Sequence, residues 1–416
     1  MNDAEPLRYL QAQEPQPSCR SLSGLDWFAF FLADVQTGWG PFVAAYLTSV
    51  AWTQLDIGLI LTLGTLVGLA MQIPAGALVD RMPAKRLLVA LAVACVSGSA
   101  LLLALWPVFS VVVGAKVLHA IASCVLGPAL AAISLGLVGH ARLSTRLGRN
   151  ARYLSLGNAI AAGVMGACAY YFSNQAIFFL TAGLGLPTLL ALARIRSGEI
   201  DLDLARGGMR RRNSGIWFDA FRAVVHNRAL LIFAAVVVLF QLGNAAMLPI
   251  MAGQMALRAP ESATLVLAVC ILGPQFVVAA IAPWTGRKAQ SWGRRPLLMS
   301  CFVALSIRGA FFAATSDPYL IIAVQLLDGI SAATLGVLVP LVIADVTRGS
   351  GHFNFVQGVV GTAVGIGASI STTLAGYVAD AFGGGVVFAF LAGVAGSGLL
   401  LVIGLMPETR GTASDA

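Results

Sequence analysis

Gly76-Ala77-Leu78-Val79-Asp80-Arg81-Met82-Pro83-Ala84-Lys85-Arg86 joins two long apolar segments, and a degenerate copy appears later in the chain. The copy begins 210 residues further on and reads Gly286-Arg287-Lys288-Ala289-Gln290-Ser291-Trp292-Gly293-Arg294-Arg295. A glycine, a potential helix-capping acid and several cations between apolar segments are typical of a short cytoplasmic connector in a membrane protein. Its recurrence indicates that the two halves of the chain are structural repeats.

The composition makes the bilayer the main solvent of this chain. Of 416 residues, 58% are hydrophobic and 11% are charged, which is too apolar for a domain with a fully hydrated surface. A spanning helix needs about 20 apolar residues. We therefore predict an all-α membrane protein with twelve transmembrane helices, near residues 25–50, 57–79, 87–106, 108–138, 153–173, 176–194, 229–256, 262–284, 296–315, 318–344, 355–379 and 385–406.

The positive charges follow membrane topology. Of the 26 Lys and Arg residues, 23 fall in the two tails and the even-numbered loops, whereas the odd-numbered loops hold only Arg258. The positive-inside rule then places both termini in the cytoplasm, as expected for a multi-pass protein of a bacterial inner membrane. The formal charge of +8 is not gathered on one soluble face, so we expect the lipid bilayer, and no nucleic acid, as the partner of these cations.

The polar punctuation divides the chain into five units. We expect a disordered cytoplasmic tail over residues 1–24, a six-helix bundle over 25–194, a cytoplasmic linker over 195–228, a second six-helix bundle over 229–406 and a tail over 407–416. Five of the six cysteines lie inside apolar segments, where cysteine usually behaves as a small hydrophobe. We accordingly expect no disulfide, no metal and no cofactor.

Matched polar features support a six-plus-six duplication. Besides the connector, Lys116-Val117-Leu118-His119-Ala120 aligns with Gln325-Leu326-Leu327-Asp328-Gly329 at an offset of 209. In the fifth and eleventh helices, Asn150 aligns with Asn354 and Gly157 with Gly361, at an offset of 204.

The connector resembles the signature Gly-x-Leu-Ala-Asp-Arg-x-Gly-Arg-Lys of the major facilitator superfamily, and nearly the whole chain fits that family. The resemblance implies two six-helix bundles that rock about a central cavity, with the two connectors as cytoplasmic latches. In the second copy Gln290 replaces the signature acid. The latch residues that the resemblance implies are Gly76, Asp80, Arg81, Lys85, Arg86, Gly286, Gly293, Arg294 and Arg295.

In style the chain is most similar to the bacterial drug/proton antiporter-like members of that family. Lys116 lies where the family's fourth helix carries an Arg, and His119 and Ala120 replace its Gln and Gly. Lysine keeps the positive charge, but its ammonium can lose a proton when it is desolvated. The fifth helix lacks the Gly-Pro step of the antiporters, which weakens the case for efflux.

Four charged residues lie well inside apolar segments: Asp34, Lys116, Arg308 and Asp328. Each costs about 2.5 to 3.5 kcal/mol at the bilayer centre, so each needs a partner or a water-filled cavity. Asp34 and His119 both lie about 14 Å deep, at about 1.5 Å per residue. We predict that Asp34 is the protonatable carboxylate and that Lys116 or His119 couples its charge state to transport. The alternative is a static ion pair between the first and fourth helices.

In the second half we expect an Arg308–Asp328 bridge, which is more simply structural because the family's ninth helix is peripheral. Asp328 joins the proton-coupling candidates only if Arg308 points elsewhere. Uncharged polar side chains at similar depth could either join helices or contact a substrate. The candidates for substrate lining are Gln36, Gln72, Trp39, Asn158, Gln241, Asn244 and Gln275.

These features favour a proton-coupled secondary transporter that moves a small organic solute by alternating access, with efflux ahead of uptake, and that works as a monomer. The first alternative is a proton symporter that imports an anionic metabolite or a siderophore-like compound, with Lys116 holding the anion. The second is a membrane sensor or scaffold without transport. The sequence has no nucleophile elbow, phosphate-binding loop or metal-ligand spacing, so we do not expect an enzyme.

Overall fold

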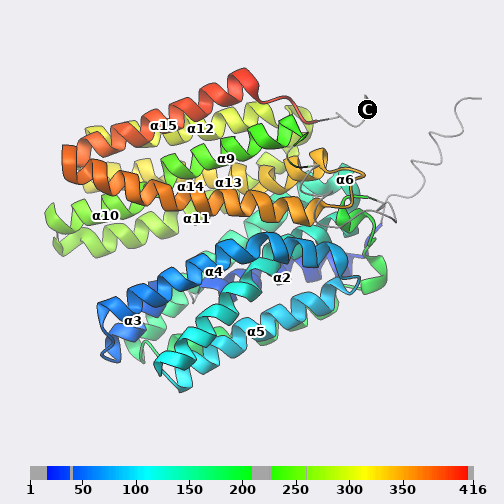
Figure 1. Ribbon diagram of the computed structural model, residues 1–416, viewed down its shortest axis with the longest axis horizontal. Helices are drawn as coiled ribbons and strands as arrows, with labels where there is room; N and C mark the ends of the chain where they lie inside the picture. Colours follow the sequence, from blue (N-terminus) through cyan, green and yellow to red (C-terminus); the bar gives the residue numbers. More distant parts are fainter. Residues whose placement is uncertain (1–15, 38–40, 209–223, 225, 259, 411–416) are drawn as a thin grey trace, which may run out of the picture.

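The computed structural model describes residues 16–37, 41–208, 224, 226–258 and 260–410. All regular elements of these residues are helices, and the long ones run roughly parallel to one another (Figure 1). The first half contains α2 (Cys19–Thr37), α3 (Pro41–Ser49), α4 (Gln54–Arg81), α5 (Lys85–Leu105), α6 (Phe109–Tyr171) and α7 (Ala176–Arg194). The second half contains α9 (Arg228–Asn244), α10 (Met247–Arg258), α11 (Pro260–Ser291), α12 (Arg295–Ala314), α13 (Pro318–Val346), α14 (Phe353–Phe382) and α15 (Gly384–Leu405).

The described helices account for twelve spans. Ten stretches are long and apolar enough to cross a membrane, and α9 with α10 form one of them. One of the ten, α6, is interrupted at Gly139, whose φ of 68° and ψ of 176° are not helical, so it crosses twice. With α2 as the first span, the predicted twelve-helix architecture is confirmed.

The fourth and fifth spans do not have the predicted loop between them. The fifth span was expected to begin near residue 153, but it begins directly after Gly139, so that Arg142, Arg146, Arg149 and Arg152 are helical. These arginines extend the helix beyond the apolar region, and two of them are ion-paired to Asp26 of α2. The four arginines that were predicted to lie in a loop therefore belong to a helix.

The first helix begins within the predicted N-terminal tail. The first helix starts at Cys19 and not after residue 24. Its start is held by Glu199 of the 3-10 turn Ser197–Glu199, which accepts hydrogen bonds from the Ser18 backbone N–H (2.9 Å) and hydroxyl (3.0 Å). At the other end, Glu408 is hydrogen-bonded to the start of α12. Of the predicted tails and linker, residues 1–15, 209–223, 225 and 411–416 lie outside the described residues.

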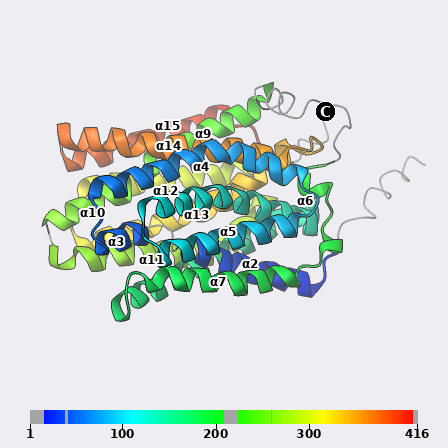
Figure 2. The ribbon, with the colours of Figure 1, turned by 60° about the horizontal axis from the view of Figure 1, so that its bottom comes forward.

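Each half has its own hydrophobic core. One cluster of buried side chains contains residues between Leu25 and Ala205, and α7 lies beside α2 at its edge (Figure 2). The other extends from Val224 to Met406 and also includes first-half residues of α4 and α6, such as Ala77 and Leu147. The halves therefore join where α4 packs on α14 and α6 packs on α11.

Glycines make these two inter-half contacts close. At each of these glycines an added Cβ would collide with a backbone carbonyl of the facing helix, so the backbones lie against each other. The glycine and carbonyl pairs are Gly76 with Asn354, Gly358 with Gln72, Gly286 with Ser144, and Gly148 with Ala282.

These contacts fix the register of the repeat. Every position in the α4–α14 contact has its counterpart 210 residues away in the α6–α11 contact. The equivalent of Asn354 is therefore Ser144, not Asn150, and the equivalent of Gly157 is Gly367, not Gly361. The predicted offset of 204 was wrong because the fifth helix was taken to begin too late.

Candidate functional site

The carboxylate of Asp80 joins the two halves at the cytoplasmic end. It accepts hydrogen bonds from the Asn354 backbone N–H (3.1 Å), the Asn354 side-chain amide (2.7 Å) and the Phe355 backbone N–H (2.8 Å). Asn354 and Phe355 lie in the first turn of α14, where backbone N–H groups have no intrahelical acceptor and the helix dipole is positive. Asp80, at the end of α4, is only 8% exposed. We call this contact the first latch.

The equivalent contact in the other pair of helices carries no charge. Gln290, at the end of α11, donates its side-chain amide to the Ala141 carbonyl at 2.5 Å, in an exposed position. A hydrogen bond between a neutral amide and a carbonyl contributes less than hydrogen bonds from helix-start N–H groups to a carboxylate. We call this the second latch, and it is the weaker of the two.

Most cations of the predicted latches do not cross between the halves. Lys85 is buried and donates to the Val79 carbonyl, and Arg86 donates to the Ala193 carbonyl at 3.3 Å. In the second half Arg294 pairs with Asp345 at 2.8 Å, and Arg295 donates to the Ile403 carbonyl. These four side chains therefore fasten each connector to its own half.

The remaining predicted latch residues are three glycines and Arg81, and they do not share one environment. Gly76 and Gly286 lie in the inter-half contacts, as already described, and Arg81 is exposed. Gly293 has a φ of +91°, which a residue with a side chain rarely adopts. It forms the turn that brings the start of α12 to Glu408.

A central cavity lies between the halves, next to the first latch. Its volume is about 430 Å³, and its walls come from α4, α6, α11, α13 and α14. Its polar side chains are uncharged: Gln72, Asn150, Ser155, Gln275 and Gln357. Gln357 also donates to the Asn354 side-chain oxygen at 3.1 Å, so the cavity is in direct contact with the residue that Asp80 holds.

The predicted lining residues divide accordingly. Gln72 and Gln275 line this cavity, whereas Gln36, Asn158, Gln241 and Asn244 do not. Trp39 lies outside the described residues. The sequence reasoning missed Asn150, Ser155 and Gln357 as lining residues. Asn150 was missed because its segment was taken for the end of a loop.

Two stripes of residues, each beginning with charged or polar side chains and ending at the cavity, run along single faces of α6 and α13. Residues three or four positions apart lie on one face of a helix. On α6 the stripe contains Lys116, His119, Ser123 and Gly127, and on α13 it contains Asp328, Ala332, Gly336 and Pro340. Gly127, Ala332, Gly336 and Pro340 line the cavity. His119 and Asp328 thus lie on the cavity-facing sides of repeat-equivalent helices.

Asp34 is buried in the first half without an ion-pair partner among the described residues. It is 4% exposed, and its Oδ1 atom is buried without a hydrogen-bond partner there. Lys116 lies with its aliphatic stem over Gly64 of α4, and His119 Nε2 is 3.2 Å from the Ser123 hydroxyl. The structure therefore does not pair Asp34 with Lys116 or His119 in this conformation.

The expected Arg308–Asp328 ion pair is present in the second half. Arg308 is also hydrogen-bonded to the Asn244 side-chain oxygen at 2.7 Å and to the Met247 sulfur at 3.3 Å, so it joins α12 to α13, α9 and α10. The Arg308 side chain is 2% exposed and that of Asp328 is 26% exposed. The acid rather than the base is therefore the accessible member of the pair.

The sequence reasoning missed a charged cluster that reaches the cavity from the cytoplasmic end of the first half. The carboxylate of Asp26 pairs with Arg146 and with Arg149, each at 2.6 Å. Arg146 donates to Asn150 (2.8 Å), which donates to Ser134 (2.7 Å). The spacing of Arg146, Arg149 and Asn150 is that of one helix face, a signal that the predicted loop concealed.

Comparison with known proteins gives three findings. The profile of the Major Facilitator Superfamily matches residues 27–288 and 244–416. The chain is 41% identical, over 395 residues and 94% of both chains, to an uncharacterized MFS-type transporter of Mycobacterium tuberculosis, in strains CDC 1551 and H37Rv. It is also 30% identical, over 99 residues and 24% of each chain, to the class B tetracycline resistance protein of Escherichia coli.

Among solved structures, the chain is similar to the crystal structure of the human organic anion transporter MFSD10 (TETRAN). The TM-score is 0.70 at 14% sequence identity, over 93% of this chain and all of the other. At this identity the likeness concerns the fold alone.

Proposed function

The chain belongs to the major facilitator superfamily, and from that premise we propose that it is a proton-coupled exporter of a small, uncharged or weakly charged organic solute. Membership makes it a multi-pass secondary transporter rather than an enzyme. The identity of the solute class, the coupling to protons and the direction of transport are the proposal, and each rests on its own observation.

The solute class follows from the central cavity. A volume of about 430 Å³ suits a small organic molecule. Its lining combines apolar side chains with four carboxamides and a hydroxyl, and none of its lining residues is charged. Such walls can hydrogen-bond a polar solute without a compensating charge, whereas a fully charged solute would be buried unpaired.

Coupling to protons is carried by one observation, the unpaired burial of Asp34. An ionised carboxylate in an apolar interior, without a partner, is strongly unfavourable. In this conformation, with both latches closed, Asp34 Oδ1 has no hydrogen-bond partner among the described residues. We propose that Asp34 holds a proton here and releases it when the bundles move.

The direction of transport rests on a separate observation. Export is supported by the partial likeness to a protein named for tetracycline resistance.

The test uses purified protein in proteoliposomes with an imposed pH gradient and an entrapped pH-sensitive dye. Uncharged amphipathic compounds that raise the thermal unfolding midpoint are first selected as solutes. Proton flux that depends on the solute and runs in the direction opposite to solute movement supports proton-coupled export. Proton flux in the same direction as solute movement supports the import alternative. Absence of any proton flux during solute movement would remove the coupling proposal.

The role of Asp34 is tested separately with Asp34→Asn. We expect this variant to lose uphill transport and to keep solute exchange, because the neutral amide resembles the protonated acid. Asp380→Asn is the matched control, since Asp380 is an exposed carboxylate near the end of α14. Uphill accumulation by Asp34→Asn at the wild-type level would contradict the proposed role.

A further inference from the structure

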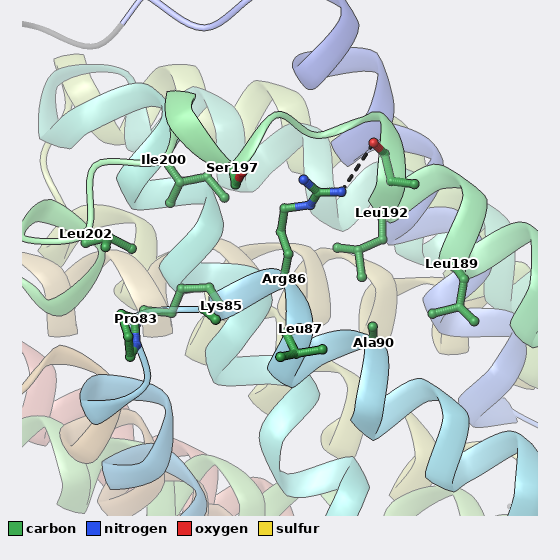
Figure 3. Close-up of a pocket in the computed structure, with 12 residues that line it drawn as sticks. Pro83, Lys85, Arg86, Leu87, Ala90, Leu189, Leu192, Ser197, Ile200 and Leu202 are labelled. Atoms are coloured by element: carbon green, nitrogen blue, oxygen red, sulfur yellow. Dashed lines mark hydrogen bonds between the residues drawn. The ribbon is translucent and has the colours of Figure 1, made fainter.

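A second cavity lies at the cytoplasmic edge of the first half, away from the central cavity. It is a groove of about 480 Å³ between the start of α5, the end of α7 and the chain that follows α7 (Figure 3). This groove is not part of the transport pathway that we propose for the central cavity. We call it the α5–α7 groove.

Arg86 provides the charge of this groove. Its guanidinium points between Ser197 and the end of α7, where one N–H group donates to the Ala193 carbonyl at 3.3 Å (Figure 3). Its Nε atom is buried without a hydrogen-bond partner among the described residues. The ammonium of Lys85 is not available, because it is bound to the Val79 carbonyl. Among the described residues the guanidinium makes one hydrogen bond, to Ala193, so N–H groups other than the buried Nε remain for a ligand of the groove.

The second half shows which chemical group binds at the corresponding helix start. At the offset of 210, Ile403 is the counterpart of Ala193 and Arg295 is the counterpart of Lys85. In the first half it is Arg86, the residue after Lys85, that donates to the Ala193 carbonyl, and in the second half Arg295 donates to the Ile403 carbonyl. There the carboxylate of Glu408 binds the start of α12, accepting from the backbone N–H groups of Arg294 (2.8 Å) and Arg295 (3.1 Å). The equivalent place in the second half is thus filled by an anion.

The first half lacks that anion. The counterpart of Glu408 is Gly198, and the helix α5 has no side-chain cap at its start. The neighbouring Glu199 is engaged elsewhere: the Ser18 backbone N–H, together with the Ser21 and Ser18 hydroxyls, holds the pKa of Glu199 below its usual value. The α5–α7 groove therefore combines a guanidinium with a helix start that has no side-chain cap, and no carboxylate lines it; of the backbone N–H groups there, that of Lys85 donates to the Pro83 carbonyl (3.0 Å).

The rest of the groove is lined mainly by apolar side chains. Leu87, Leu189, Leu192, Ile200 and Leu202 line it, and Leu87 is 55% exposed. A small inorganic anion would leave these walls in water, whereas a lipid would cover them with an acyl chain. The groove lies at the cytoplasmic ends of two spanning helices, where anionic lipid headgroups gather.

We propose that the α5–α7 groove binds an anionic phospholipid of the cytoplasmic leaflet, with its phosphate on Arg86 and the first turn of α5 and an acyl chain along the leucines. The lipid phosphate takes the place that Glu408 fills in the second half.

The first test measures binding of phosphatidylglycerol to delipidated full-length protein by native mass spectrometry. Arg86→Gln should weaken the tightest binding step by about tenfold, the size expected for loss of a charge-assisted hydrogen bond. Arg142→Gln, which removes an exposed cytoplasmic arginine outside the groove, should change it by less than about twofold. Equal binding by wild type and Arg86→Gln would overturn the proposal.

The second test places a carboxylate of the protein itself in the proposed phosphate site. Gly198→Glu recreates the arrangement of the second half, and a side chain at this position meets no neighbouring atom. We expect Gly198→Glu to exclude phosphatidylglycerol from the tightest site while Gly198→Gln retains it. Retention by Gly198→Glu at the wild-type level would overturn the placement of the phosphate.

Two further probes distinguish the source of the phosphate. Phosphatidylcholine should bind this site more weakly than phosphatidylglycerol, and inorganic phosphate at the same concentration should not displace phosphatidylglycerol. Equal binding of phosphatidylcholine would mean that only the apolar wall is recognised, and displacement by inorganic phosphate would mean a free-anion site. Either result would overturn the assignment to an anionic lipid.

Discussion

The first latch should control how often the cytoplasmic side opens, and Asp80→Asn tests this directly. The substitution keeps the size of the side chain but removes the charge that faces the start of α14. Asp80 accepts three hydrogen bonds, two of them from backbone N–H groups. A hydrogen bond to a charged group contributes about 1.5 to 3 kcal/mol and a neutral one about 0.5 to 1.5 kcal/mol. Over three bonds, the closed state should lose about 3 kcal/mol, which is about a hundredfold in the ratio of closed to open protein.

The assay is a distance measurement between spin labels on the cytoplasmic ends of the two halves. Arg194 at the end of α7 and Leu405 at the end of α15 are both exposed and can be replaced by labelled cysteines after the native cysteines are removed. Wild type should show mainly the short distance, and Asp80→Asn should add a longer one.

The matched control is the second latch. Gln290→Ala removes one neutral hydrogen bond from an exposed side chain, so it should shift the ratio by less than about tenfold. If Asp80→Asn leaves the distances unchanged, or if Gln290→Ala shifts them as far, then the carboxylate does not dominate the closed state and the reasoning fails.

Three further predictions concern packing and charge. Arg308→Met should lower the unfolding free energy by about 3 kcal/mol, the lower end of the cost of breaking a buried ion pair, because it leaves the 26% exposed Asp328 without its partner. Adding Asp328→Asn should restore most of this stability, and a double variant as unstable as Arg308→Met would contradict the prediction. Gly358→Val should force α14 away from α4 and favour the open distance in the spin-label assay, whereas Gly98→Val, which meets no neighbouring atom, should not. Glu199→Gln should lower the thermal midpoint only at higher pH: the lowered pKa of Glu199 stabilises the fold above the unfolded pKa of about 4.3, and this contribution is lost as pH falls through the folded pKa. A difference between Glu199→Gln and wild type that does not shrink as the pH falls below about 4.3 would refute that assignment.

The twelve spans and their direction could be read from sequence because lipid requires long apolar segments and cytoplasmic loops concentrate cations. The same rule failed where a helix leaves the bilayer without ending. Arg146 and Arg149 look like loop residues, yet Asp26 pairs with both and they continue the helix from Gly139. Pairing across helices is not visible in a hydropathy pattern.

The site was less predictable than the fold. Individual polar residues in apolar segments are visible, but which of them face the cavity depends on the register between the halves. Gln72 and Gln275 were candidates and line it, whereas Asn244 was a candidate and instead binds Arg308. Gln357, the fifth residue of α14, lies within the predicted helix 355–379, but it was missed because its place at the cavity depends on how α14 packs against the other half.

The two repeats place their carboxylates differently, and this bears on how the transporter opens. In the first half the acid at the connector, Asp80, reaches across to the other half, and Gly198 leaves the start of α5 without an acid. In the second half Glu408 holds the start of α12 within its own half, and Gln290 makes the contact across. The described contacts at the two latches therefore include one charged and one neutral connection. Cytoplasmic opening must release a carboxylate from α14 but only an amide from the second span of α6, so we expect the energetic barrier to lie on the α4–α14 side.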